Sequence, residues 1–110
     1  MERIILTGAA KGLGAILYKD LSEEHDVLGY DKEVCMDVLY PSHELIDAFK
    51  PTILINCAAL NDEDDFTRRE GNKRMSKACR EFVKLIINVE PTDDVKGLCH
   101  AIRSSIAAVG

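Results

Sequence analysis

The chain lacks the features that mark nucleic-acid-binding, membrane and repeat proteins. Its 14 Lys and Arg are outnumbered by 19 Asp and Glu, and the net charge of −5 disfavours binding to nucleic acid or to an anionic membrane surface. No apolar run approaches the roughly 20 residues that a membrane-spanning helix needs. Internal repeats, low-complexity tracts and linkers are also absent from the 110 residues, which predicts one globular domain.

The four cysteines form no Cys-x-x-Cys pair, and most of them fall in apolar periodic segments. The three histidines complete no ligand spacing with them, so no metal site is expected. Buried free thiols are typical of a reducing compartment, which predicts a cytoplasmic protein. The N-terminus enters an apolar run directly, without the layout of a signal peptide.

The segment 3–14, RIILTGAAKGLG, indicates a buried strand, a glycine-rich turn and the start of a helix. Gly8 allows a sharp turn, Gly12 allows a pyrophosphate to approach the backbone, and Gly14 allows the helix to pack against the strand. The N–H groups at the helix start then face the anion. Asp31 ends the next apolar run, where a carboxylate can accept hydrogen bonds from an adenosine ribose. This predicts an adenine-dinucleotide site; the alternative is a glycine turn in an unrelated α/β domain.

Strand-like runs alternate with segments of helical spacing along the whole chain, which predicts an α/β protein. The expected architecture is a single three-layer domain with a Rossmann-like, doubly wound parallel sheet of about five strands in the order 3-2-1-4-5. Strands are expected at residues 3–7, 26–30, 34–36, 52–56 and 83–89. Helices are expected at 12–24, between Pro41 and Pro51, along a face with Met75, Ala78, Cys79 and Phe82, and after Thr92 as the cap.

Charge is unevenly distributed around the helix that follows residue 65. Acidic residues precede it at 62–65, and basic residues follow along it: Arg68, Arg69, Lys73, Arg74, Lys77, Arg80 and Lys84. This order complements the helix dipole, and a solvated helix face is the favoured interpretation. A phosphate-bearing partner is the alternative.

Four segments resemble the short-chain dehydrogenase/reductase superfamily: TGAAKGLG at 7–14, YDKE at 30–33, MDV at 36–38 and INCAA at 55–59. Residues 37–59 and 72–86 are more similar to its dTDP-4-dehydrorhamnose reductase branch. The resemblance covers residue 1 to about residue 88 and implies NAD as the cofactor, with NADP as the alternative.

The resemblance implies a cofactor site with these members: Thr7, Gly8, Lys11, Gly12, Leu13, Gly14, Asp31, Lys32, Asp37, Val38, Asn56, Cys57 and Ala58. The glycines would hold the pyrophosphate. Asp31 would bind the adenosine ribose and favour NAD, whereas Lys32 would accept the 2′-phosphate of NADP.

Asp37 and Val38 would flank the adenine, and residues 56–58 would lie beside the cofactor at a strand end. The alternative for Asp37 is a turn or cap residue. The alternative for Asn56 is a strand-end residue that satisfies loop backbone.

The chain departs from this family where the family does its chemistry. The family's catalytic Tyr, followed four residues later by Lys, has no counterpart, because the last tyrosine is Tyr40. The loop between Ala59 and Glu70 is short, and the family's helix asparagine falls at Arg68. The segments that would build a substrate pocket are missing, so the catalytic residues stay unassigned.

Three functions are compatible with these residues. The favoured one is a nucleotide-binding domain of NAD(H) type without catalysis. The second is an NAD(P)-dependent oxidoreductase, acting on a sugar nucleotide or another carbonyl substrate, whose proton donor comes from a partner chain, Cys57 or Thr92. The third is a regulatory or structural protein that has lost its ligand. Self-association as a homodimer is expected through the strand at 83–89, an apolar run at the predicted sheet edge.

We predict that the chain alone has no appreciable dehydrogenase activity, because a positioned proton donor contributes roughly a hundred- to ten-thousandfold to such a rate. Steady-state assays with NADH or NADPH and a panel of sugar-nucleotide ketones are expected to show background oxidation only. Turnover above about 1 s⁻¹ would contradict the prediction.

Overall fold

The computed structural model describes residues 1–34, 36–57 and 65–110. Its strands are β1 (Arg3–Thr7), β2 (Asp26–Tyr30), β3 (Ile53–Asn56) and β4 (Leu85–Asn88). They form a parallel sheet in the order β2-β1-β3-β4. Its helices are α1 (Gly12–Leu21), α2 (His43–Phe49), α3 (Asp65–Cys79) and α4 (Val95–Val109), with a short 3₁₀ turn, η1, at Lys32–Val34. The described part of the chain is therefore an α/β protein with one parallel sheet.

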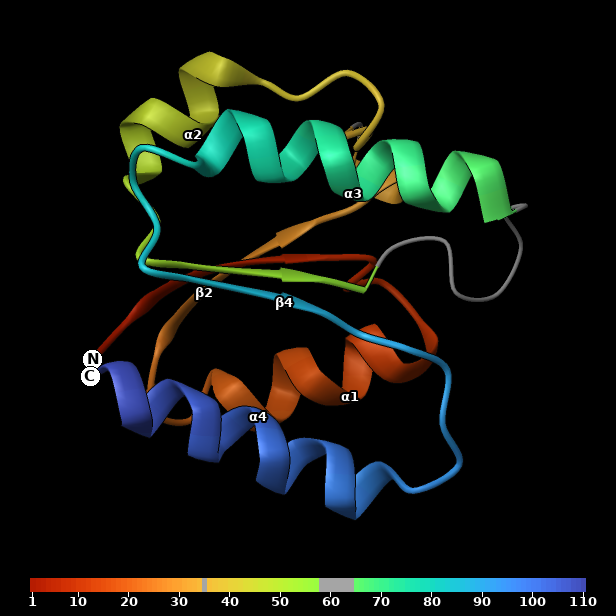
Figure 1. The fold of residues 1–110 in the computed structure, drawn as a ribbon, viewed down its shortest axis with the longest axis vertical. Helices are drawn as coiled ribbons and strands as arrows, with labels where there is room; N and C mark the ends of the chain where they lie inside the picture. The colour runs from red at the N-terminus through yellow and green to blue at the C-terminus, as the bar shows by residue number, and fades with distance from the viewer. Residues whose placement is uncertain (35, 58–64) are drawn as a thin grey trace.

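The helices cover both faces of the sheet (Figure 1): α1 and α4 lie on one face, and α2 and α3 on the other. The alternation of side chains along β1 explains the two layers. Ile4 and Leu6 pack into the cluster that contains residues of α1 and α4, whereas Ile5 packs into the cluster under α2 and α3. Strand β3 repeats the pattern, with Leu54 on the side of Ile5. Each fully buried side chain of this size contributes about 1.5–3 kcal/mol.

The sheet has four strands among the described residues, so the expected five strands and their order 3-2-1-4-5 are wrong. The missing strand is the one expected at 34–36. There the carbonyl of Asp31 accepts hydrogen bonds from the N–H groups of Val34 and Met36, at 3.1 and 3.0 Å. The chain curls into η1 and does not extend beside β2, and Val34 is left 56% exposed. The other apolar runs pair with the neighbours expected of them.

Helix boundaries also differ from the expectation. Helix α3 ends at Cys79, so Phe82, which was expected on its inner face, lies in the turn that follows. Helix α1 ends at Leu21, not residue 24, because the N–H groups of Glu24 and His25 both bond to the Leu21 carbonyl and tighten the chain before β2. Helix α4 is capped by Asp94, whose carboxylate accepts a hydrogen bond from Gly97 N at 2.9 Å. The predicted cap, Thr92, accepts a hydrogen bond from Asp94 N and so supports the capping residue.

The helix expected between Pro41 and Pro51 forms as α2, but it begins at His43 after the N-cap Ser42, so Pro41 lies before the helix and not in its first turn. Oγ of Ser42 accepts a hydrogen bond from Leu45 N at 3.2 Å, and Lys50 closes the helix in the left-handed conformation before Pro51. On the other face of the sheet, an ion pair between Arg103 and Asp20 joins α4 to the neighbouring α1. Asp20 raises the pKa of the Arg103 guanidinium through this contact.

Strand β4 lies at an edge of the sheet, and its Ile86 is 37% exposed. The sequence predicts that a homodimer forms through this exposed strand edge, and self-association stays a prediction. The cysteines described, at 57, 79 and 99, are buried free thiols, as the sequence indicates. No helix in the described part of the chain combines the length and apolar character needed to cross a bilayer.

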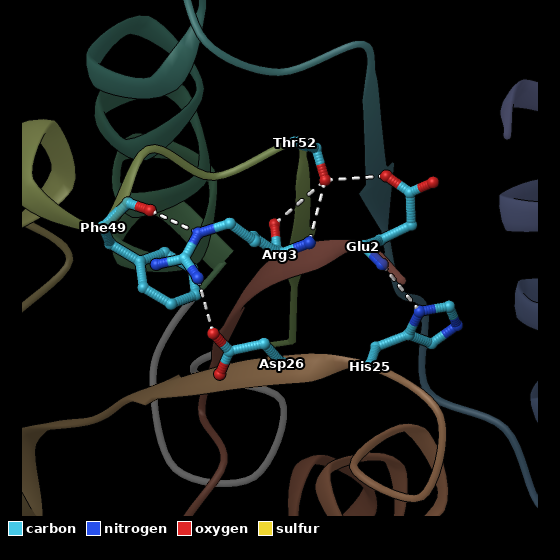
Figure 2. Close-up of polar contacts among 6 residues, drawn as sticks. All are labelled: Glu2, Arg3, His25, Asp26, Phe49 and Thr52. Carbon is cyan, nitrogen blue, oxygen red and sulfur yellow. Dashed lines mark hydrogen bonds and ion pairs between the residues drawn. The ribbon is translucent and has the colours of Figure 1, made fainter.

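Polar contacts join the strands at their amino ends (Figure 2). The Thr52 hydroxyl accepts a hydrogen bond from Arg3 N at 3.0 Å and donates its proton to Oε1 of Glu2 at 2.8 Å. Lys84, just before β4, lies 3.1 Å from the other carboxylate oxygen of Glu2. The Glu2 N–H donates to Nδ1 of His25 at 3.0 Å, just before β2. Glu2 therefore ties together the amino ends of strands from both sides of β1.

Arg3 joins the same edge to α2. Its Nε donates to the Phe49 carbonyl, and Nη1 donates to Oδ2 of Asp26, both at 2.7 Å. The guanidinium carbon lies 4.3 Å from the centroid of the Phe49 ring, a cation–π distance. One side chain thus contacts the end of α2 and the start of β2.

We predict that Glu2→Gln weakens folding by about 1 kcal/mol at neutral pH, because a hydrogen bond to a charged acceptor at the surface has roughly this worth. The hydroxyl of Thr52, and then Lys84, lower the pKa of Glu2 below its ordinary 4.5. A carboxyl group whose pKa is lower in the folded than in the unfolded state stabilises the fold at pH values above its unfolded pKa. This stabilisation is lost as the pH falls through the folded pKa.

Urea denaturation at pH 7 and in steps below pH 4.5 tests this, since 4.5 is the ordinary value. The stability difference between the parent and Glu2→Gln is expected to shrink as Glu2 becomes protonated. A difference that stays constant down the acid series would contradict the assigned contacts.

Candidate functional site

The turn between β1 and α1 has the backbone shape that the glycines predict. Gly8 and Gly12 have φ values of 68° and 62°, a left-handed conformation that a side chain makes costly. The Gly8 N–H donates to the Tyr30 carbonyl at 2.9 Å, which extends the pairing of β1 with β2 by one residue. The turn therefore starts at the carboxyl end of the sheet and delivers the chain directly into α1.

Gly14 sets how closely α1 approaches this turn. A Cβ on Gly14 would lie 1.8 Å from the carbonyl oxygen of Gly8 and 2.6 Å from its carbon. These are backbone atoms, which cannot rotate away. The close packing of helix against strand that the sequence predicts for Gly14 is thus present. Leu13, beside it, packs against the cluster under α1 and α4.

The start of α1 differs from the start of an ordinary helix. Its N-cap residue is Lys11, in extended conformation, and the Lys11 side chain makes no cap hydrogen bond. No acidic residue lies in the first turn. The N–H groups at a helix start need acceptors, and Ser, Thr, Asp or Asn usually supplies one. A lysine side chain supplies none, and uncapped N–H groups at a helix start attract anions in general.

Asp31 lies at the same turn. One of its carboxylate oxygens, Oδ2, accepts a hydrogen bond from the Ala10 N–H at 3.1 Å. The bond joins the end of β2 to the glycine turn and holds a carboxylate beside it. Lys32, which follows in η1, is exposed. The structure therefore brings Asp31 to residues 8–14, as the cofactor hypothesis requires.

The connections of the sheet change direction between the carboxyl ends of β1 and β3. These strands are neighbours, and the helices that follow them, α1 and α3, cover opposite faces of the sheet. Ligands of open parallel sheets bind where the connections diverge in this way. Here the fully buried Thr7 accepts a hydrogen bond from Cys57 N at 2.9 Å, which fixes the spacing of the two strand ends.

The Cys57 thiol is part of the core, not of an exposed reactive site. It is buried in the cluster beneath α1 and α4, and burial raises its pKa to about 11. A thiol with this pKa stays protonated at neutral pH, and only thiolates are good nucleophiles. Cys57 therefore has none of the properties of an activated catalytic cysteine.

Asn56 occupies the last position of β3 and pairs in register with Asn88, the last residue of β4. Its Nδ2 donates to Oδ1 of Asn88 at 2.9 Å and to Oγ of Ser76 at 3.3 Å. Asn56 is 1% exposed, and among the described residues nothing donates to its Oδ1. Its bonds reach side chains of β4 and α3, whereas the sequence alternative was a bond to loop backbone.

The predicted adenine residues have structural roles of their own. Asp37 accepts a hydrogen bond from Leu39 N at 2.9 Å and so closes a turn, as its alternative interpretation holds. Val38 is buried against α3, where a Cβ on Gly71 would lie 2.6 Å from its Cγ2. Contact of either residue with adenine stays a prediction. Ala58, the last predicted member of the site, lies outside the described residues.

Sequence reasoning did not identify Ser76 and Asn88 as neighbours of Asn56. One signal was available: Asn88 follows a short apolar run just as Asn56 does. In neighbouring parallel strands, such residues lie side by side at the carboxyl edge. Elsewhere in the described ranges, no three His, Cys, Asp or Glu residues gather as metal ligands would.

Comparisons with protein-family models, with curated proteins and with solved structures give no match for this chain.

We predict that Gly14→Ala destabilises the protein by about 3 kcal/mol, because the new methyl group must push α1 off the turn. Gly29→Ala is the matched control. Its Cβ would meet only the Ala9 methyl at 3.1 Å and the Tyr18 ring at 3.4 Å, so we expect a change below about 1 kcal/mol. Urea midpoints at unchanged m-value measure both changes. Equal midpoints for the two variants would contradict the close approach of α1.

Proposed function

We propose that this chain binds an adenine dinucleotide of the NAD(H) type at the turn between β1 and α1. One observation carries the proposal: α1 begins after a lysine N-cap that lies between two left-handed glycines, with the carboxylate of Asp31 bonded to the same turn. A helix start without a side-chain cap suits a phosphate, and a carboxylate at the end of the next strand suits a ribose.

The two halves of the adenosine diphosphate would be held by different chemistry. Gly12, without a side chain, lets the pyrophosphate reach backbone N–H groups, and Lys11 adds positive charge beside them. Asp31 would accept hydrogen bonds from the ribose hydroxyls and repel a 2′-phosphate, since like charges placed together cost several kcal/mol. NAD is therefore the favoured cofactor, and Lys32 is the residue that would favour NADP.

The proposed family is the short-chain dehydrogenase/reductase superfamily, and the proposed fold type is its Rossmann-like layout. A parallel sheet with helices on both faces, and a glycine turn after its central strand, supports this. Neither substitute proton donor gains support. Cys57 is a buried thiol with a raised pKa, and the Thr92 hydroxyl accepts the Asp94 N–H at the start of α4. Binding without dehydrogenation is thus the proposed activity.

Gly12→Val tests the phosphate turn. A β-branched residue is strained at a φ of 62° and would occupy the space of the pyrophosphate, so NAD binding is expected to be lost. In a thermal-shift assay, NAD at a hundred times its Kd is expected to stabilise the parent by about 2.7 kcal/mol, a shift of several degrees. No shift for the parent, or an equal shift for a folded Gly12→Val variant, would contradict the proposal.

Asp31 gives a second prediction that does not depend on the folding of the glycine variant. The parent is expected to bind NAD at least tenfold more tightly than NADP, and Asp31→Asn is expected to remove most of this preference. Asp26→Asn is the matched control, because Asp26 begins β2, the strand that Asp31 follows, and pairs with Arg3 at the amino end of the sheet. Calorimetric Kd values for both cofactors decide the matter. Tighter binding of NADP than of NAD by the parent would show that Lys32, and not Asp31, determines the cofactor preference.

A further inference from the structure

A second concave site lies between α3 and the segment that follows β4. It is a pocket of about 430 Å³, a size that suits a small molecule. Three cations line it, together with two amides and a hydroxyl group: Arg68, Arg69, Lys73, Asn72, Asn88 and Ser76. In a chain with a net charge of −5, this is a local excess of positive charge on a hollowed surface.

The spacing of α3 explains how these groups gather. Residues 68, 72 and 76 are four apart and share one face of the helix, and residues 69 and 73 lie beside them. Ser76 accepts the hydrogen bond from Asn56 that was described at the end of β3, which fixes this face over the strand ends. The carboxyl edge of the sheet therefore forms the floor of the pocket, and α3 forms its basic wall.

Three groups of the pocket keep a donor that bonds to none of the described residues. Oδ1 of Asn88 accepts from Asn56, whereas its Nδ2 donates to none of the described residues. The Ser76 hydroxyl accepts from Asn56 and keeps its own proton for another partner. Lys73 makes no ion pair within the described ranges. These three donors, in a lining with three cations and the carboxylate of Glu90, fit an anion.

Not every cation of α3 takes part. Arg74 pairs with Glu70 at 3.0 Å and donates to the Leu39 carbonyl at 2.7 Å, so it joins α3 to the segment before α2. Lys77 also lies outside the pocket lining. The sequence favours a solvated face for the basic residues of α3. In the structure, Arg74 makes structural contacts, whereas Arg68, Arg69 and Lys73 line the pocket.

We infer that this pocket binds a small molecule through a phosphoryl group, at a site separate from residues 8–14. A phosphoryl group carries up to two negative charges and accepts several hydrogen bonds, and it matches the planar donors of arginine as well as an ammonium group. Glu90 also lines the pocket, 3.6 Å from Nη1 of Arg68, and is 78% exposed. A bound anion would compete with this carboxylate for the arginine.

The first experiment is a titration of the ¹⁵N-labelled protein with inorganic phosphate and, separately, with glucose 1-phosphate and with NAD. It is done in 0.15 M salt, where general surface attraction is largely screened. Saturable shifts of the amides at 68–76 and 88–90 with inorganic phosphate and glucose 1-phosphate are expected. These shifts should persist in Gly12→Val, which separates this site from the proposed dinucleotide site. Shifts of both segments with NAD alone, in a single transition, would overturn the inference of a separate site.

Charge variants give the second experiment. Lys73→Glu is expected to raise the Kd for inorganic phosphate about tenfold or more. Lys77→Glu makes the same charge change on the same helix outside the pocket, and a change below about threefold is expected. Glu90→Gln is expected to tighten binding about twofold, an outcome that a damaged fold cannot produce. Equal effects of the two lysine variants, or absent shifts in the parent, would overturn the inference.

Discussion

The contact between Gly14 and Gly8 is the constraint on which the carboxyl edge of this protein depends. The helix starts so close to the end of β1 that even a methyl group on Gly14 would overlap the Gly8 carbonyl. Because the turn between them is also held by left-handed glycines and by Asp31, the helix start cannot move independently of the sheet. The position of the proposed phosphate site is thus set by backbone packing, together with the side-chain contact of Asp31.

The amino and carboxyl edges of the sheet differ in how their polar and charged groups are paired. At the amino edge, Glu2, Arg3 and Thr52 satisfy one another across strands, and their charges are paired. At the carboxyl edge, the N-cap side chain of α1 supplies no acceptor, and three cations line the pocket beside α3. A ligand that neutralises charge would bind at the carboxyl edge, because the charged groups at the amino edge already have partners within the protein.

Sequence reasoning located β1 and β2 to the residue because short apolar runs bounded by turn signals leave few alternatives. It failed where local hydrogen bonds decide the structure. The Asp31 carbonyl curls residues 32–34 into a 3₁₀ turn, and Asp94 takes the cap position two residues after Thr92, although both residue types cap well.

The same division holds for the site. The glycine turn is local, so its shape and the role of Gly14 were predictable from spacing. The group formed by Asn56, Ser76 and Asn88 depends on the register of β3 with β4 and on the rotation of α3, and no single segment of sequence contains that information. The terminal residues, finally, lie side by side: a Cβ on Gly110 would be 3.3 Å from Oε2 of Glu2, at the amino edge (Figure 1). A domain whose first and last residues lie side by side can be inserted into a surface loop of a host protein, or cyclised through a short linker. In either case the connections are made at the amino edge, and the carboxyl edge is left unobstructed.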